Sequence, residues 1–150
     1  MKFTPSLQRL LQLRRSLERQ EEMKLSLLAA RRQAAEQDRE RERECERREQ
    51  VELLDGLRDR LSGAELQAAG LRHAVDTLRT ARLQAEAEQA AVAQAGQRQI
   101  WLERTRERET LSTLAAQCHE QEVRERRRED QAALDEAFLL DPARPRGGQD

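Results

Sequence analysis

The sequence predicts an all-α protein, a long antiparallel two-helix coiled-coil hairpin, and three observations lead to this prediction. Aromatic residues are 2% of the 150 residues and charged residues 38%, so a compact domain has few large side chains to bury. Proline occurs only near the two ends, at Pro5, Pro142 and Pro145. Nothing between those ends therefore forces a helix to break, whereas Gly56, Gly63 and Gly70 gather where a chain reversal is expected.

The first helix is expected over about residues 5–61. Thr4 can cap its N-terminus, and Pro5 suits the first helical position because the proline φ angle is already helical. Leucines then recur at helical spacing. We expect a broad heptad stripe, and its members are Leu7, Leu10, Arg14, Leu17, Glu21 and Lys24.

Residues 36–50 form a charged run in which Cys45 is the one apolar side chain. Arginine and glutamate are good helix formers, and oppositely charged residues recur three positions apart. These i,i+3 pairs are Glu36/Arg39, Glu40/Arg43 and Glu44/Arg47. We therefore expect the helix to continue through the run with a solvated face.

The reversal is expected within residues 55–70, where Asp55-Gly56 and Ser62-Gly63 are the strongest turn signals. A short additional helix at this tip is also compatible with the segment. The second helix is expected over about residues 64–139, and the two helices make one domain over 1–140. The remaining residues, 141–150, are rich in proline, glycine and arginine and predict a disordered tail.

Folding the chain near Gly63 places residue i opposite residue 126 − i. The leucine-rich start then faces the stretch around Trp101, for which we expect a structural packing role. The charged run faces the alanine-rich residues 76–90, where small side chains permit close approach. The second helix is the longer one, so residues near 124–139 are expected to project past the first by about 20 Å.

The charge pattern disfavours nucleic acid as a partner. The net charge is −1, whereas residues 1–35 carry +5, which suits an acidic protein surface better than phosphates. No signal peptide and no apolar run long enough for a membrane span occur, so a cytoplasmic location without membrane insertion is expected. In that compartment Cys45 and Cys118 are expected to be free thiols.

Catalytic and cofactor motifs are missing from the sequence. His73 and His119 lie far apart, and no phosphate-binding loop, zinc motif or nucleophile elbow occurs. We therefore expect a protein that is not an enzyme and that holds no metal or other cofactor.

Both ends of the chain resemble the FliJ family of flagellar export proteins. The first segment reads Phe3-x-x-x-Leu7-Gln8-x-Leu10-Leu11-x-Leu13-Arg14. The second reads Glu129-Asp130-Gln131-Ala132-Ala133-Leu134-Asp135-Glu136-Ala137, an acidic-Gln pair followed by a DE pair. Trp101 also sits where such proteins can carry a tryptophan, and the helical pattern agrees over the whole chain.

The resemblance implies a soluble stalk of the flagellar type III export apparatus, peripheral at the cytoplasmic face of the inner membrane. Its implied partners are the hexameric export ATPase, the cytoplasmic linker of the export-gate membrane protein, and export chaperones. The residues expected to bind the ATPase are Arg9, Arg14, Arg15, Arg126, Arg127, Arg128, Leu134 and Phe138. Those expected to bind the export gate are Leu71, Val75, Leu78 and Arg82.

Two alternatives stay open at this point. The related injectisome stalks, which are YscO-like, share the implied architecture. A generic coiled-coil scaffold or spacer would instead be expected to self-associate along a continuous stripe.

Overall fold

The computed structural model describes residues 5–140, which are all-helical apart from a short connection. Two helices, α1 (Pro5–Arg58) and α2 (Gly63–Leu139), pack against each other. No strand occurs in this described range. Residues 141–150, for which a disordered tail was predicted, and the Thr4 cap lie outside the described residues.

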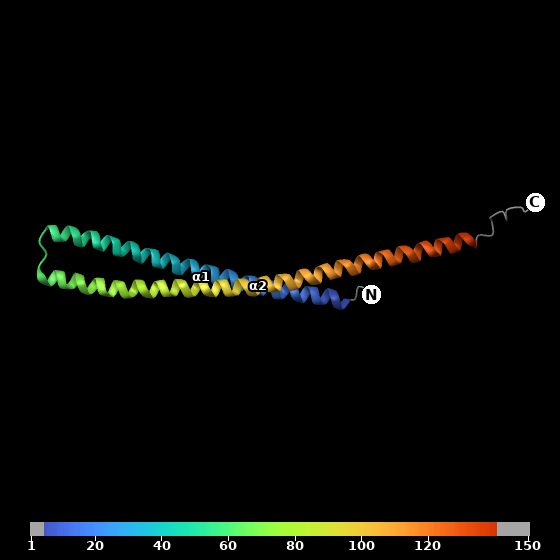
Figure 1. Cartoon of the computed structure of the whole chain (residues 1–150), viewed down its shortest axis with the longest axis horizontal. Coiled ribbons are helices and arrows are strands. Elements are labelled where there is room, and N and C mark those ends of the chain that lie inside the picture. Colours follow the sequence, from blue (N-terminus) through green and yellow to red (C-terminus); the bar gives the residue numbers. More distant parts are fainter. Residues whose placement is uncertain (1–4, 141–150) are drawn as a thin grey trace, which may run out of the picture. The chain divides into compact units, whose positions relative to one another are not determined.

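The chain divides into two compact units, each of which contains part of both helices. Unit 1 contains the start of α1, up to Ser16, and the end of α2, from Thr105. Unit 2 is Leu17–Arg104, in which the later part of α1 and the earlier part of α2 lie side by side up to the connection between them (Figure 1).

The connection, residues 59–62, depends on two local devices. Arg60 has a φ angle of 61°, in the left-handed region that non-glycine residues seldom occupy, and this residue turns the chain. Ser62 then caps α2 in a reciprocal capping box with Glu65. The Ser62 backbone N–H donates to the Glu65 carboxylate at 2.8 Å, and the Glu65 backbone N–H donates to the Ser62 hydroxyl at 3.3 Å.

Two expectations for the tip are corrected by this geometry. Asp55 and Gly56 do not form a turn but belong to α1, where the side chain of Leu61 folds over Gly56 and its nearest carbon comes within 3.4 Å of where a Cβ would stand. No additional short helix forms at the tip within the described residues, because the capping box starts α2 directly after the connection.

Within unit 2, the side of α1 that faces α2 follows a heptad repeat. The half-buried residues recur at spacings of three and four, or of seven where the intervening Arg32 and Glu49 are exposed, at Glu18, Glu21, Leu25, Leu28, Ala35, Arg39, Glu42, Glu46, Leu53 and Gly56. The stripe expected from the sequence was wrong at Lys24. This residue is exposed, and Leu25 faces inward instead. This frame leaves the lysine charge in water and brings two more leucines inward.

The facing side of α2 in unit 2 follows the same repeat. Its half-buried and buried members include Ala69, Asp76, Thr80, Leu83, Ala87, Ala90, Gln94, Gln97 and Trp101. Cross-helix contacts run in antiparallel order: Gln97 donates to the Glu21 carbonyl, Arg32 to Gln94, Arg39 to Gln84, and Thr80 to Glu46. Arg32–Gln94 and Glu46–Thr80 fall on the 126 − i register, whereas Glu21 meets Gln97 where the register expected residue 105.

Within unit 1, the described start of α1 packs on a short part of α2. Arg14 forms an ion pair with Glu107, and Leu7 and Leu11 are half-buried. Ala115, with 6% of its surface exposed, is the most buried residue of this unit's described part. Counted from the Arg14–Glu107 ion pair, α1 begins nine residues away, at Pro5. The antiparallel α2 reaches that level nine residues after Glu107, at residue 116, and then continues to Leu139, well past the start of α1.

Candidate functional site

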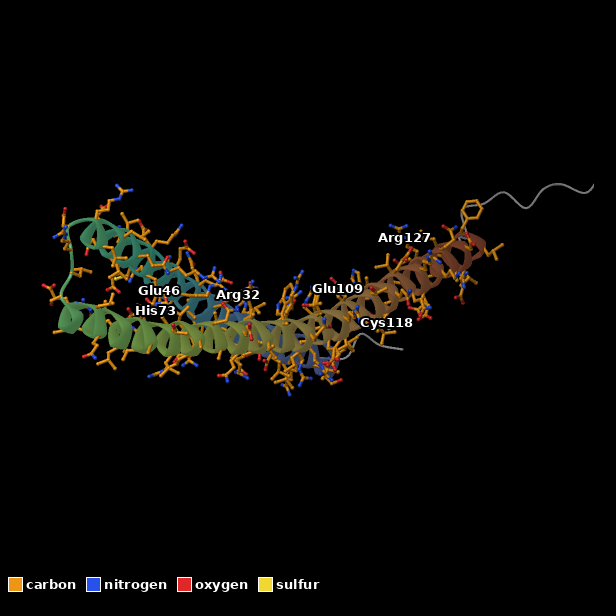
Figure 2. The ribbon with its side chains drawn as sticks, turned by 60° about the vertical axis from the view of Figure 1, so that its left-hand side comes forward. Arg32, Glu46, His73, Glu109, Cys118 and Arg127 are labelled. Carbon is orange, nitrogen blue, oxygen red and sulfur yellow. The ribbon has the colours of Figure 1, made fainter. Side chains whose placement is uncertain are left out.

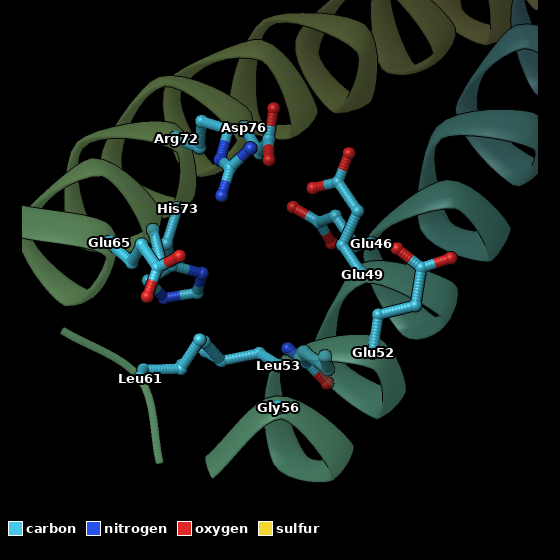
Figure 3. Close-up of a pocket in the computed structure, with 12 residues that line it drawn as sticks. Glu46, Glu49, Glu52, Leu53, Gly56, Leu61, Glu65, Arg72, His73 and Asp76 are labelled. Carbon is cyan, nitrogen blue, oxygen red and sulfur yellow. The ribbon is translucent and has the colours of Figure 1, made fainter. Parts of the chain in front are cut away.

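A polar cavity of about 370 Å³ lies between α1 and α2 at the tip of unit 2 (Figure 3). We call it the tip cavity. Its lining is rich in carboxylates, and the residues are Glu46, Glu49, Gln50, Glu52, Leu53, Gly56, Leu61, Glu65, Ala69, Arg72, His73 and Asp76. The cavity exists because α1 supplies glutamates at the facing positions where leucines would otherwise pack.

Two carboxylates meet across this cavity, Glu49 from α1 and Asp76 from α2. The hydrogen bond with Asp76 and the charge of Asp76 raise the pKa of Glu49, with a smaller contribution from burial, while Arg72 opposes them. Burial and the nearby charge of Glu49 also raise the pKa of the Cys45 thiol. Two carboxyl groups that lie close together tend to share one proton, because the charge of one disfavours ionisation of the other.

The tip cavity does not offer a metal site. Among residues 5–140 no group of three or more histidine, cysteine, aspartate or glutamate side chains is placed to hold a metal ion. His73 lines the cavity, whereas His119 is exposed on the part of α2 in unit 1, and Cys45 and Cys118 are free thiols. The cavity brings together one carboxylate from each helix, Glu49 and Asp76.

Acidification is expected to stabilise the tip through Glu49. Because the folded chain raises its pKa, the Glu49 contribution to stability is complete below the ordinary value of 4.5 and is lost as the pH rises through the raised value. The wild-type chain should therefore lose melting temperature relative to Glu49→Gln as the pH rises above 4.5. Circular dichroism melts of both proteins across this pH range measure the difference.

Glu44→Gln is the matched control, because the hydrogen bond from Arg48 lowers the pKa of Glu44 and the sign reverses. That variant should lose stability at neutral pH and approach the wild type as the pH falls below 4.5. Parallel pH profiles for the wild type and Glu49→Gln would show that the carboxylate pair does not form.

The basic residues expected at the ATPase-binding end are not gathered into one patch. Arg9 and Arg15 are exposed, whereas Arg14 is half-buried and bonded to Glu107. Arg127 lies twenty residues beyond Glu107 on α2, which corresponds to about 30 Å along a helix. The two groups of arginines expected to bind the ATPase are therefore separated along α2.

The end of α2 forms an exposed segment that we call the C-terminal extension, residues 124–140. Every residue in it is exposed, and it carries the predicted Arg126, Arg127 and Arg128 (Arg127 is labelled in Figure 2). Leu134 and Phe138, one helical turn apart, are also exposed, together with Leu139 and Leu140. This extension places basic and apolar side chains on a helix that no described part of α1 covers.

The residues expected at the export gate lie on the side of α2 that points away from α1. Leu71, Val75, Leu78 and Arg82 are all exposed. The first helix, α1, packs instead on the stripe of α2 that contains Asp76, Thr80 and Leu83. Trp101 is half-buried on the facing side, and its indole nitrogen is buried without a hydrogen-bond partner.

Sequence reasoning missed the Glu49–Asp76 pair and the capping box. The Ser-x-x-Glu spacing at Ser62 was a readable signal for the cap. The carboxylate pair had no such signal, because it depends on which faces of two helices meet.

No protein-family model matches the chain, and neither the curated proteins nor the solved structures include a significant match. Among the described residues, neither helix contains a stretch that is both long and apolar enough to cross a bilayer.

Proposed function

We propose that this chain is an antiparallel coiled-coil hairpin that serves as the central stalk of a flagellar type III export apparatus. In this proposal it binds the hexameric export ATPase, couples it to the cytoplasmic linker of the export gate, and acts as a general chaperone or as an escort of export chaperones. It works in the cytoplasm, peripheral to the inner membrane. The heptad repeat shared by both helices in unit 2, and their contacts in antiparallel order, support the coiled-coil part.

The C-terminal extension is the observation that carries the proposal. A single helix that continues beyond its packing partner, with exposed arginines and then exposed leucines, is suited to entering a ring. The same residues include the segment that resembles the FliJ C-terminal signature. The basic side chains would orient the helix in an acidic channel, since charge pairing steers association more than it adds affinity.

Leu134 and Phe138 would provide the apolar contact at the end of this extension. Arg9, Arg14 and Arg15 would contribute a second basic contact, in which Arg14 acts mainly through its bond to Glu107. Leu71, Val75, Leu78 and Arg82 would bind the gate linker, because they form an exposed stripe on α2.

Stimulation of the hexameric export ATPase tests the proposal. The wild-type chain is expected to raise ATP hydrolysis, and changing Arg126, Arg127 and Arg128 together to glutamate is expected to abolish the stimulation while helicity is retained. The physical reason is that three charge reversals would repel an acidic ring surface. A coupled phosphate-release assay measures the rate, and circular dichroism measures helicity.

The matched control reverses Arg41, Arg43 and Arg47, three exposed arginines on α1 in unit 2, and should leave the stimulation intact. Full stimulation by the Arg126/Arg127/Arg128 variant would remove the extension from the mechanism. No stimulation by the wild-type chain would favour the scaffold alternative, and stimulation of an injectisome ATPase alone would favour the injectisome stalk.

A further inference from the structure

We propose that a second copy of this chain docks antiparallel on the outer face of α2 in unit 2, which gives a two-fold symmetric dimer. The α2 outer face consists of Leu71, Val75, Leu78, Arg82, Ala85, Gln89, Val92 and Gly96. The proposal goes beyond the stalk function and does not depend on it. Self-association is also what the scaffold alternative expects, so the ATPase-stimulation test, and not the dimer, separates stalk from scaffold.

The α2 outer face carries larger apolar side chains than most of the side that packs on α1. Leu71, Val75, Leu78 and Val92 have 71%, 63%, 73% and 73% of their surface exposed. Ala74, Ala81 and Ala95 lie beside them and are exposed as well. An apolar stripe of this length, left in water on a helix, is typical of an interaction surface.

The spacing of the stripe specifies what can cover it. Leu71, Leu78, Ala85 and Val92 recur at intervals of seven, with Val75, Arg82, Gln89 and Gly96 four residues after each. A strict heptad repeat does not drift around its helix relative to a partner that has the same repeat. The occupant is therefore a helix with its own apolar heptad stripe.

The facing residues of a second copy complement this stripe when the two copies run antiparallel. Pairing Val75 with Val92 of the copy sets the register. In that register Leu71 meets Gly96, where a Cβ would find nothing within 4 Å, so the leucine has room to pack against the backbone. Leu78 meets Gln89, and Arg82 meets Ala85.

The charges beside the stripe agree with the same register. Arg79 and Glu86 occupy equivalent flanking positions, and such positions face each other in antiparallel helix pairs. Arg79 of each copy then lies opposite Glu86 of the other. In the dimer Arg79 would exchange its ion pair with Glu42 of α1 for this contact, and Glu86 would exchange its ion pair with Arg82. Arg82 then comes within reach of Glu88. A parallel pairing would instead set Arg79 beside Ala74 and Glu86 beside Ala81, where neither finds an ion-pair partner, so charge favours the antiparallel arrangement.

The outer side of α1 is more charged at this level. Its residues there include Arg41, Glu44, Arg47 and Arg48, all of which are exposed, with ion pairs between Arg48 and Glu44 and between Arg41 and Asp38. The large exposed apolar residues of α1 at this level, Val51 and Leu54, follow this charged run and do not continue along it, so the longer apolar stripe here is on α2. A dimer formed there would cover the same residues that we assign to the export gate, so the two contacts exclude each other.

Sedimentation equilibrium of the full-length chain, from micromolar to submillimolar concentration, tests the dimer. The wild type is expected to dimerise, and Val75→Lys or Val92→Lys should each raise the dimer dissociation constant by about tenfold or more. Leu27→Lys is the matched control, because Leu27 on α1 is 67% exposed and lies outside the stripe. It should dimerise like the wild type, and circular dichroism should show equal helicity for all four proteins.

Charge reversal and crosslinking test the direction of the pairing. Arg79→Glu and Glu86→Arg should each weaken the dimer, and the double variant should restore it. In a chain whose Cys45 and Cys118 are changed to serine, Val75→Cys with Val92→Cys should form an intermolecular disulfide, whereas Val75→Cys alone should not.

A monomer at every concentration would overturn the proposal, as would a dimer that Val75→Lys and Val92→Lys leave unchanged. Efficient crosslinking of Val75→Cys to itself would overturn the antiparallel arrangement. Each of these results would leave the ATPase-stimulation test unaffected, since that test depends on the C-terminal extension in unit 1.

Discussion

Trp101→Ala is expected to lower the free energy of unfolding by about 3 kcal/mol, the lower end of what buried tryptophan truncations cost. Trp101 occupies a facing heptad position of α2, four residues after Gln97, which bonds to Glu21 of α1. Much of the rest of this side of α2 is alanine or glutamine, so the indole supplies a large share of the apolar surface there. Urea unfolding followed by circular dichroism measures the change.

Trp101→Phe separates the packing contribution from the polar one. The indole N–H of Trp101 is buried without a hydrogen-bond partner, which costs stability in the wild type. Phenylalanine keeps an aromatic ring and removes that donor, so this variant should lose much less than Trp101→Ala. Similar midpoints for Trp101→Ala and the wild type would show that the tryptophan does not anchor the two helices.

The sequence could predict the helices because local physics decides them. No proline occurs between Pro5 and Pro142, and residues 36–50 are mostly strong helix formers, so local preference favours helix. The connection at residues 59–62 lies inside the 55–70 segment for the same reason, since glycine and serine weaken the helix there. The residue that reverses the chain could not be predicted, because Arg60 rather than a glycine adopts the left-handed conformation.

The facing side of each helix could not be predicted with the same success. In α1, Leu10 and Leu11 are adjacent, so two heptad frames each gather leucines, and only the partner helix selects between them. In α2, the frame through Leu71 and Leu78 is more apolar than the frame that packs on α1. In the structure this more apolar frame lies on the exposed side of α2. The hydrophobicity of a stripe does not tell which surface the stripe will cover.

The reason for this choice lies in side-chain size. The long arginine and glutamate side chains of α1 need small partners, and the frame through Ala69, Ala87 and Ala90 supplies them. Polar side chains of the two helices then bond across this contact. Arg79 forms an ion pair with Glu42 at 3.3 Å, and Arg39 donates a hydrogen bond to Gln84 at 3.1 Å. The large apolar residues of α2 are thereby left for other partners.

Ala87→Leu is the direct test of this size argument and is expected to destabilise the chain by about 1–3 kcal/mol, as overpacking does. Ala87 has 4% of its surface exposed, the lowest fraction among the described residues. It lies one helical turn after Gln84, beside Arg39, whose Nε is already buried without a partner. A leucine there would push α1 away and weaken the Arg39–Gln84 bond.

Ala34→Leu provides the comparison, because Ala34 is exposed on α1 and the same change adds no buried volume there. Leucine and alanine differ little in helix propensity, so this variant should unfold within about 0.5 kcal/mol of the wild type. Equal urea midpoints for Ala87→Leu and Ala34→Leu would mean that α1 and α2 do not approach closely at Ala87. A midpoint for Ala87→Leu above that of the wild type would mean that leucine is accommodated there, and the choice of facing stripe would then need a cause other than side-chain size.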